Sequence, residues 1–405
     1  MNHLFGKAAF ATLVLLTSGS AEAKWFELVR ELPVETPVGP EFGRNVATDG
    51  VVVAGAALSS DSAPGSVGGA GYVFDPTSGA LLNRLSDSST SRADAFGLTI
   101  AVSGDRALVG APRGATQFDT AYLFDLTTGA LLGKPTGDVR SENSFGSAMA
   151  MDNDIALIGS PREFISDTQR GAVYIVNTQD GSRLGKLTSA STPTSWFGSS
   201  VDLDGGLALI GSPDFSGVGL ASLFDLSLPA KLLDLAPDDT PADNSFGTQV
   251  AIDDGVAIVA APGARSGAAY LFDVSTGEQL TKLTGVGNRI AEHFGASVAI
   301  DNGIAVVGAP GVGAIYVFDV KTGTEIDRLT LDPSVLRTNF GDRLAFKDGL
   351  LAVSAGPGGG NRTGAVYVYR LVPEPPVVWL AATALAPLAS RRRRPAARLL
   401  EKVAV

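Results

Sequence analysis

The chain has 405 residues, of which 45% are hydrophobic, and its formal net charge is −11. This length suffices for several hydrophobic cores or for one domain built from repeats. The absence of cysteine excludes disulfides and thiolate chemistry, and the negative charge disfavours nucleic acid as a partner.

The N-terminus has the order of a secretory signal peptide. Lys7 precedes an apolar run from Ala8 to Leu16, and the small-residue sequence Ala21-Glu22-Ala23 follows. We expect residues 1–23 to be removed by cleavage after Ala23. The alternative interpretation is a buried first strand or helix.

A Phe-Gly pair recurs along the chain at intervals of 46 to 54 residues. This spacing is typical of one blade of a β-propeller. Each copy continues with the same order of apolar runs and turn residues, so we expect one structural unit per copy. The pairs begin at Phe42, Phe96, Phe145, Phe197, Phe246, Phe294 and Phe340.

Two strands are predicted directly after each Phe-Gly pair. The first ends at an acidic turn such as Asp301-Asn302-Gly303, where Asp-Gly and Asn-Gly pairs supply the positive φ angles of a tight hairpin. The second strand ends at a proline, because proline cannot donate to a β ladder. These prolines are Pro112, Pro161, Pro213, Pro262 and Pro310.

Two further strands complete each unit. The third is rich in aromatic and β-branched residues, as in the run from Tyr316 to Phe318, which is typical of a half-buried strand. A Thr-Gly or Ser-Gly turn leads to a fourth strand with apolar residues three apart, as at Leu280 and Leu283. Four antiparallel strands with short turns make one propeller blade.

The last copy lacks a fourth strand after Tyr369, and the segment before the first copy supplies the missing pattern at residues 25–32. We expect this segment to pair with the last copy. The sequence therefore predicts an all-β fold over residues 24–371: a seven-bladed β-propeller with four antiparallel strands per blade. The N-terminal strand is expected to complete blade seven and to close the ring.

With this order of strands and turns, the repeats resemble the FG-GAP family, which includes the propellers of integrin α-subunit heads and of many bacterial surface proteins. The resemblance covers residues 24–371. Family members often bind calcium through a D-x-D-x-D-G loop in the first hairpin. The turns of this chain have one or two carboxylates, so we interpret them as hairpin chemistry and expect no cofactor. Weak calcium binding is left open at Asp152 with Asp154 and at Asp202 with Asp204.

The Phe-Gly pairs and small-residue-proline sequences are interpreted as structural, with each Phe in the core between blades. Trp196 is interpreted as a core residue, and stacking on a sugar is the alternative if its ring is exposed. His293 is interpreted as a loop residue without a catalytic role, since no serine or metal constellation converges on it in the sequence. No catalytic residue is therefore predicted.

Specificity is expected in the loops that differ most between copies, because the repeats themselves are scaffold. The longest of these precede the third strand, at residues 59–69, 113–120 and 162–170. Carboxylates in such loops could also act as a pair in a glycosidase, which keeps hydrolysis open as an alternative activity.

The C-terminal segment, residues 372–405, has three parts in order. The sequence Pro373-Glu374-Pro375 is followed by an apolar stretch that contains Trp379 and then by a basic cluster, Arg391, Arg392, Arg393 and Arg394. This segment resembles the PEP-CTERM sorting signal of Gram-negative bacteria, in which an exosortase recognises the Pro-Glu-Pro motif and removes the tail. A plain C-terminal membrane anchor is the alternative.

These features together predict an exported propeller on the outer surface or in the extracellular matrix of a Gram-negative bacterium. Its expected activity is non-enzymatic binding or adhesion to a protein or an exopolysaccharide. Its expected processing partner is an exosortase-type enzyme, with transient membrane anchoring by the tail. The alternatives are a secreted hydrolase that uses loop carboxylates and a structural matrix component without a specific ligand.

Overall fold

The computed structural model describes residues 24–32, 42–49, 53–57, 69–90, 95–112, 120–138, 144–165, 168–189, 196–214, 219–228, 230–239, 245–263, 267–285, 292–331, 339–356 and 364–372. The chain divides into two units, Met1–Pro373 and Glu374–Val405. The second unit and the predicted signal peptide lie outside the described residues.

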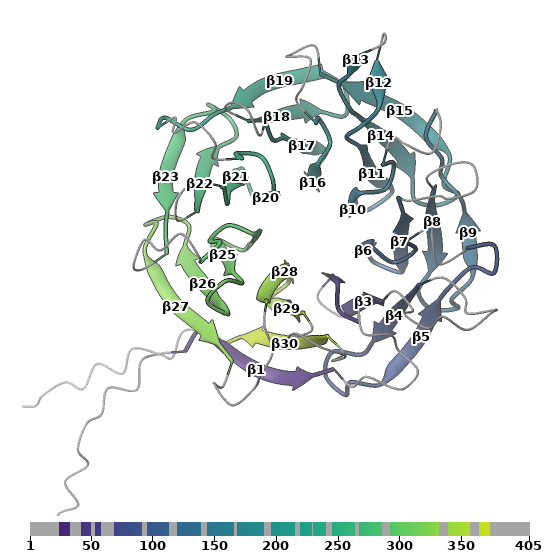
Figure 1. Cartoon of the computed structure of the whole chain (residues 1–405), viewed down its shortest axis with the longest axis horizontal. Helices are drawn as coiled ribbons and strands as arrows, with labels where there is room; N and C mark the ends of the chain where they lie inside the picture. Colours follow the sequence, from purple (N-terminus) through teal and green to yellow (C-terminus); the bar gives the residue numbers. More distant parts are fainter. Residues whose placement is uncertain are drawn as a thin grey trace, which may run out of the picture. The chain divides into compact units, whose positions relative to one another are not determined.

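The first unit is an all-β propeller with four-stranded antiparallel blades, and Figure 1 shows its sheets arranged around a common centre. We number the seven four-stranded sheets in chain order. Sheets 1 to 3 are β2 (Asn45–Thr48), β3 (Val53–Ala57), β4 (Ala70–Phe74) and β5 (Leu81–Leu85); β6 (Thr99–Ser103), β7 (Arg106–Ala111), β8 (Thr120–Asp125) and β9 (Leu131–Gly133); and β10 (Ala148–Asp152), β11 (Ile155–Ser160), β14 (Ala172–Asn177) and β15 (Arg183–Thr188).

The next three sheets follow the same order. They are β16 (Ser200–Asp204), β17 (Leu207–Ser212), β18 (Leu220–Asp225) and β19 (Ala230–Leu235); β20 (Val250–Asp253), β21 (Val256–Ala261), β22 (Ala268–Asp273) and β23 (Gln279–Leu283); and β24 (Ser297–Asp301), β25 (Ile304–Ala309), β26 (Ala314–Asp319) and β27 (Glu325–Thr330).

Sheet 7 combines the two ends of the described chain. Its strand order is β1 (Phe26–Glu31), β30 (Ala365–Leu371), β29 (Leu350–Ala355) and β28 (Phe340–Lys347). β1 pairs antiparallel with β30, with Phe26 opposite Leu371. The N-terminal strand thus occupies the fourth-strand position of the last repeat, as its sequence pattern predicts.

The burial of the strands follows their place in the sheet. The middle strands are buried on both faces, as in β25, where every residue from Ile304 to Ala309 is buried. The outermost strands alternate, since Leu280 of β23 is 50% exposed and Leu283 is 1% exposed. The two leucines of the fourth-strand pattern therefore face opposite sides, and the second one packs in the core.

The turns take the conformations that their residues favour. Asn302 and Gly303 have φ angles of 50° and 75° between β24 and β25, which matches the tight hairpin predicted from Asn-Gly. β25 ends at Ala309, directly before Pro310. The predicted prolines thus follow the ends of the second strands.

The Phe-Gly pairs hold neighbouring sheets together. All seven phenylalanines are at most 2% exposed, and Phe294 packs edge-on against Tyr316 and Phe318 of β26, with centroid distances of 5.2 and 6.1 Å. Gly295 has a φ of 88°, and a Cβ there would lie 2.6 Å from the carbonyl oxygen of Ala268 in sheet 5. Glycine is therefore required at this close approach between two backbones, and the predicted structural role of the pair is confirmed.

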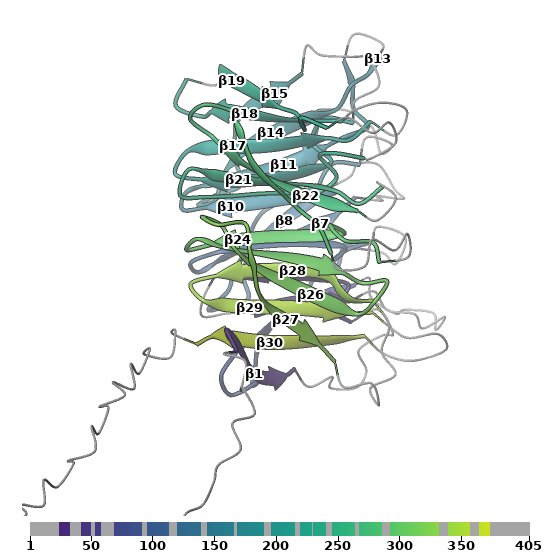
Figure 2. The same cartoon turned by 90° about the vertical axis from the view of Figure 1, so that its left-hand side faces the viewer.

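The strand order gives the propeller two different faces. The hairpin face contains the tight turns between first and second strands and between third and fourth strands; the loop face contains all other connections. Figure 2 shows the loop-face strand β13 (Thr168–Gln169) on the right, and this strand pairs with β12 (Phe164–Ile165). The N–H of Leu371 donates to the carbonyl of Gly349, in a turn of the hairpin face, at 2.7 Å. Both ends of the described chain therefore lie at the hairpin face.

Candidate functional site

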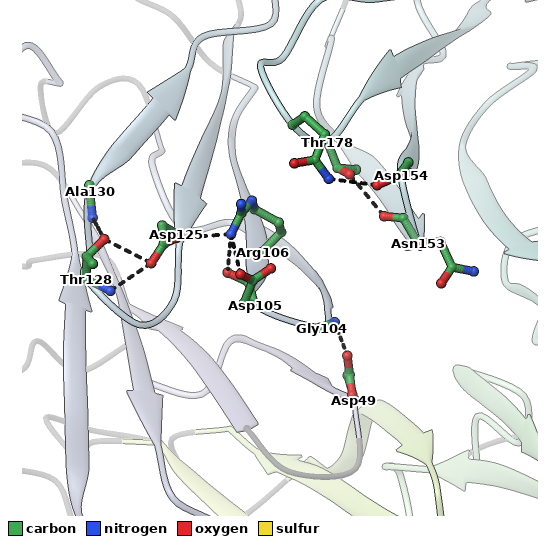
Figure 3. A network of polar contacts seen from close by, with 11 residues as sticks. Asp49, Gly104, Asp105, Arg106, Asp125, Thr128, Ala130, Asn153, Asp154 and Thr178 are labelled. Carbon is green, nitrogen blue, oxygen red and sulfur yellow. Dashed lines mark hydrogen bonds and ion pairs between the residues drawn. The ribbon is translucent and has the colours of Figure 1, made fainter.

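The first pair of candidate calcium ligands, Asp152 and Asp154, contacts separate partners. Asn153 donates through its side-chain amide to Asp152 at 2.9 Å, and Gln179 donates through its amide to Asp154 at 2.7 Å. Figure 3 shows Asn153 and Asp154 in the turn between β10 and β11, where Thr178 donates to the carbonyl of Asn153 at 3.0 Å. Both carboxylates take part in hydrogen bonds of the turn.

The second pair, Asp202 and Asp204, contacts the next sheet. The backbone N–H of Ile252 donates to Asp202 Oδ2 at 2.8 Å, and that of Asp254 donates to Asp204 Oδ2 at 3.1 Å. Within the described ranges, no group of three or more His, Cys, Asp or Glu side chains is arranged to hold a metal ion. The two carboxylates thus accept hydrogen bonds across the boundary between sheets 4 and 5.

The hydrogen bond that Asp204 accepts from the backbone N–H of Asp254 is one example of a contact that recurs between consecutive sheets. In five of the seven copies, the residue seven positions after the Phe of the pair accepts a hydrogen bond from a backbone N–H in the first hairpin of the following sheet. Figure 3 shows the bond from Gly104 to Asp49. The acceptors and donors are Asp49 with Gly104, Ser103 with Asn153, Asp204 with Asp254, Asp253 with Asn302, and Asp301 with Gly349.

These four aspartates and Ser103 have a role beyond the turn chemistry predicted for the first hairpins. Each joins its own sheet to the next one, so the first hairpins form a series of inter-sheet hydrogen bonds. The signal that could have revealed this role is the fixed distance from the Phe-Gly pair, which a turn alone does not require. In sheet 7 that position is held by Lys347.

Asp202 has an unusual environment for a carboxylate. It lies five positions after Phe197, and the same position in the other copies is always alanine: Ala47, Ala101, Ala150, Ala251, Ala299 and Ala345. Burial raises the pKa of Asp202 to about 7, with a further increase from the negative charge of Asp204 and an opposing effect of Lys347. Asp202 is therefore a carboxyl group that changes charge near neutral pH at a position that alanine holds in the other six copies.

On the loop face, Trp196 is half-buried and is covered by a cation. The Arg162 guanidinium lies 5.1 Å from the centre of the indole ring. The interpretation of Trp196 as a core residue is therefore wrong in part, because the residue is only half-buried. Stacking of this kind stabilises the orientation of an arginine side chain.

Residues 162–170 include a small hairpin of β12 and β13, whereas the sequence predicted only a long loop there. The N–H groups of Arg170 and Gly171 both donate to the carbonyl of Glu163 at 3.0 Å and close the base of this hairpin. The N–H of Phe197 donates to the carbonyl of Arg170 at 3.3 Å. The hairpin base is thus bonded to the segment that carries Trp196.

We define the Arg162–Trp196 patch as Arg162, Phe164, Arg170 and Trp196. Phe164 is 56% exposed, and Arg162 is also exposed. Among these residues, the contact that the structure shows is that of Arg162 with the Trp196 ring.

An ion pair and a hydrogen bond connect Glu163, at the base of the hairpin, to strands β15 and β14. Glu163 is 1% exposed, accepts a 2.8 Å hydrogen bond from the hydroxyl of Tyr174, and pairs with Lys186. Lys186 also contacts Asp138 at 3.1 Å, and Arg183 pairs with the same carboxylate. Burial raises the pKa of Tyr174 to about 12, so this hydroxyl stays protonated and donates to Glu163 at neutral pH.

His293 is exposed and has a φ of 52°. Four of its counterparts before other Phe-Gly pairs have the same left-handed conformation: Ala95, Ser144, Ser245 and Asn339, with φ between 52° and 63°. The carbonyl of His293 accepts a hydrogen bond from Ala296 N–H at 3.1 Å. The geometry is that of a loop residue in a recurring turn.

The predicted processing and sorting residues lie outside the described residues. They are Ala23, Pro373, Glu374, Pro375, Trp379, Arg391, Arg392, Arg393 and Arg394. A search of the described part of the chain for helices long and apolar enough to cross a membrane identifies none.

Comparisons with known proteins match part of the chain to one family model and find solved structures of similar fold. Residues 231–272, which include the Phe-Gly pair at Phe246, match the model of the FG-GAP repeat. The match and the fold together support a propeller of the FG-GAP type. No curated protein sequence matches the chain. A similar solved structure is the crystal structure of BamB from Moraxella catarrhalis, with 16% identity and a TM-score of 0.49 over 82% of this chain and 85% of that one.

Proposed function

We propose that this chain is an exported FG-GAP-type propeller that binds a protein or an exopolysaccharide without catalysing a reaction. The observation that carries the proposal is the difference between the two faces. The hairpin face has short, repetitive turns joined by inter-sheet hydrogen bonds, whereas the loop face has an additional hairpin with an exposed Phe164. Binding residues in repeat scaffolds are concentrated in such non-equivalent loops.

The proposal includes a seven-bladed ring closed by β1. One contact at the end of β1, within sheet 7, and two contacts between sheets 7 and 1 support closure. Leu32, which follows β1, donates to the carbonyl of Val366 at 2.8 Å. A Cβ on Gly43 would lie 2.8 Å from the carbonyl oxygen of Ala365. Leu32, Phe42 and Val366 share one buried hydrophobic cluster. A closed ring leaves no unpaired sheet boundary at either end.

Two acids among the described residues of the loop face are engaged in ion pairs, which supports binding over hydrolysis at that place. Asp138 and Glu163 are both held in ion pairs, with Arg183 and Lys186. A glycosidase needs two carboxyl groups that are free to exchange protons and to reach the substrate. The proposed binding needs no cofactor.

For the cellular location, we propose export by the predicted signal peptide, with cleavage after Ala23, and sorting by the predicted tail. In this proposal an exosortase-type enzyme recognises Pro373-Glu374-Pro375 while the apolar stretch and the arginine cluster hold the tail in the membrane. Both ends of the described chain lie at the hairpin face. Attachments at either end would therefore start from the face opposite the loops.

Two measurements test the proposal. The first is fractionation of cells that produce the full chain or a variant without the last 30 residues. We expect the full chain at the outer surface or in the matrix, and an identical distribution of both forms would contradict the sorting role. The second is incubation of the purified protein with the matrix polysaccharide and with surface proteins of the host. We expect saturable binding to one of them, and release of reducing ends would instead indicate a hydrolase.

A further inference from the structure

The carboxylate of Asp327 in β27 binds the first residues of the N-terminal strand β1. Its Oδ2 accepts hydrogen bonds from the backbone N–H groups of Trp25, at 2.8 Å, and of Phe26, at 3.2 Å. Phe26 is 2% exposed and belongs to the same buried cluster as Leu329 of β27. Sheet 6 therefore fixes the point at which β1 begins, next to the exposed residue Lys24.

Asp327 is the single acidic residue at its place in the repeat. The residues that are paired in the same way in the fourth strands of the other sheets are Arg30, Asn83, Gly133, Gly185, Leu233 and Thr281. Most of them lie against the turn between the third and fourth strands of the next sheet, as Asn83 does through hydrogen bonds to the carbonyl groups of Leu126 and Thr127. Sheet 7 has no such turn, because its fourth strand is β1. The acid therefore occurs where a strand begins, whereas neutral or basic residues occur where a turn passes.

Among the described residues, no cation pairs with Asp327. The guanidinium of the next residue, Arg328, pairs with Glu325 at 2.7 Å and lies over the Tyr316 ring. The backbone N–H of Arg328 donates to Asp327 Oδ1 at 2.7 Å. An ionised carboxylate has about four acceptor sites, and the three backbone N–H groups occupy three of them. A positive group at the start of β1 would use the remaining site and balance the charge.

Cleavage after Ala23 would create such a group, because Lys24 would then begin the chain with a free α-ammonium. The backbone nitrogen of Lys24 is about 3.5 Å from that of Trp25 by covalent geometry, and the Trp25 nitrogen lies 2.8 Å from Asp327 Oδ2. Lys24 lies outside β1, so rotation about its backbone bonds can bring the ammonium to the carboxylate. In the uncleaved chain the same nitrogen is a neutral amide.

We propose that Asp327 binds the α-ammonium group of Lys24 that signal-peptide cleavage produces, so that processing strengthens the contact between β1 and sheet 6. This inference rests on the cleavage after Ala23 that is part of the proposed function. Asp327 is thus the docking site of the processed N-terminus. The unprocessed chain makes the backbone hydrogen bonds but lacks the ion pair.

The test compares two forms of the chain that are otherwise complete. One begins at Lys24, and the other begins at Ala21 and so moves the ammonium three residues away; both are released from a cleavable N-terminal fusion. Each is made with Asp327 unchanged and as Asp327→Asn, which keeps the shape of the side chain and removes its charge. Glu325→Gln is the matched control, because Glu325 is an acid of the same strand with a partner in that strand. The measurement is the midpoint of thermal unfolding at about pH 6 and about pH 10 in low salt.

At about pH 6 the form that begins at Lys24 should melt about 2 °C above the form that begins at Ala21, as expected for one partly buried ion pair in a domain of this size. A neighbouring carboxylate raises the pKa of an ammonium, so this stabilisation is complete below the ordinary α-amino pKa of about 7.8 and is lost as pH rises through the folded-state value. The difference should therefore largely disappear at about pH 10. It should also disappear with Asp327→Asn and persist with Glu325→Gln.

Other charged groups near β1 do not account for such a difference, because they are present in both forms. The charged side chains of the strands that meet here are Glu325, Asp327 and Arg328 in β27, Glu27, Arg30 and Glu31 in β1, and Arg370 in β30. Carboxylates and guanidinium groups ordinarily keep their charge between about pH 6 and pH 10.

Equal midpoints of the two forms at about pH 6 would overturn the inference, and so would a difference that Asp327→Asn leaves unchanged. If Asp327→Asn does not fold, the form that begins at Lys24 is acetylated at its α-amino group, which should lower its midpoint to that of the Ala21 form. Mass spectrometry of the exported protein identifies its first residue independently. A first residue other than Lys24 would contradict both the proposed cleavage and this inference. Equal midpoints with Lys24 as the first residue would remove the ion pair and leave the proposed function standing.

Discussion

The backbone N–H of Ile252 donates a 2.8 Å hydrogen bond to Asp202 Oδ2 across the boundary between sheets 4 and 5. At the equivalent boundaries the position of Asp202 is held by alanine, so no carboxylate lies there. Sheet 4 therefore contacts sheet 5 through an ionisable group at a place where the other sheets use a methyl group.

This contact predicts a pH-dependent stability. The folded-state pKa of Asp202 is about 7, above its ordinary value of 3.8. The folded protein therefore binds this proton more tightly than the unfolded chain, and stability falls as pH rises from about 4 to about 7. Asp202→Ala should remove this loss and gain about 2 kcal/mol relative to the unchanged protein between pH 4 and pH 8, after allowance for partial solvent screening. Urea unfolding at several pH values measures the difference.

Asp202→Asn is the control for that experiment, because it keeps the acceptor oxygen and removes the charge. It should lose the same pH dependence as the alanine variant. A stability difference between Asp202→Ala and the unchanged protein that stays constant across this pH range would contradict the assigned pKa.

A second prediction concerns the glycine of the Phe-Gly pair. Gly247 and Gly255 have similar φ angles, 87° and 77°, but a Cβ on Gly247 would lie 2.5 Å from the carbonyl oxygen of Leu220, whereas nothing lies within 4 Å of one on Gly255. Gly255→Ala should cost about 1 kcal/mol for the left-handed backbone. Gly247→Ala should cost at least about 3 kcal/mol, since the clash with a backbone atom is added. Equal costs in thermal unfolding would show that the sheets do not approach closely at this point.

A third prediction concerns the ion pair between Glu163 and Lys186. Because Glu163 is 1% exposed, Glu163→Gln leaves a charge without its buried partner and should cost about 3 kcal/mol. Glu325→Gln is the matched control, since its pair with Arg328 is partly exposed and should contribute at most about 1 kcal/mol. The measurement is the free energy of unfolding in urea. A small effect of both substitutions would mean that the network does not support the hairpin.

A fourth prediction uses the absence of cysteine to test closure by β1. Glu27 and Arg370 are opposite each other in the β1–β30 pair and are both exposed. The double variant Glu27→Cys, Arg370→Cys should form an intramolecular disulfide and gain up to about 5 kcal/mol, because the bond closes a loop of nearly the whole propeller. Non-reducing electrophoresis and thermal unfolding measure this. The control pair, Glu27→Cys with Glu278→Cys, should stay reduced as a monomer, and the same behaviour of the first pair would argue against closure.

The sequence predicted the repeated strands well because each depends on local patterns. The φ angles of Asn302 and Gly303 follow from the turn residues alone, and the burial of Phe294 follows from its recurrence at a fixed interval. The pairing of β1 with β30 was also accessible, since the last copy visibly lacks a strand. All of these features can be recognised by comparing one copy with another.

The missed features depend on contacts between copies. Asp202 could be seen as an acidic residue, but its burial and its bond to Ile252 arise from the neighbouring sheet. Likewise, Trp196 was assigned to the core from its residue type, and the Arg162 side chain that contacts it lies in a segment that departs from the repeat. Repeat patterns describe the scaffold, whereas the candidate site lies where the pattern is broken.

The central claim is that the loop face binds ligand and that the hairpin face is scaffold. It is tested by amide hydrogen exchange of the full chain, with and without the host's matrix polysaccharide at saturation. We expect slower exchange at loop-face amides such as Gly171 and Phe197, and unchanged exchange at the hairpin-face amides of Gly104, Asp254 and Asn302. Saturable binding that slows exchange only at those hairpin-face amides would contradict it.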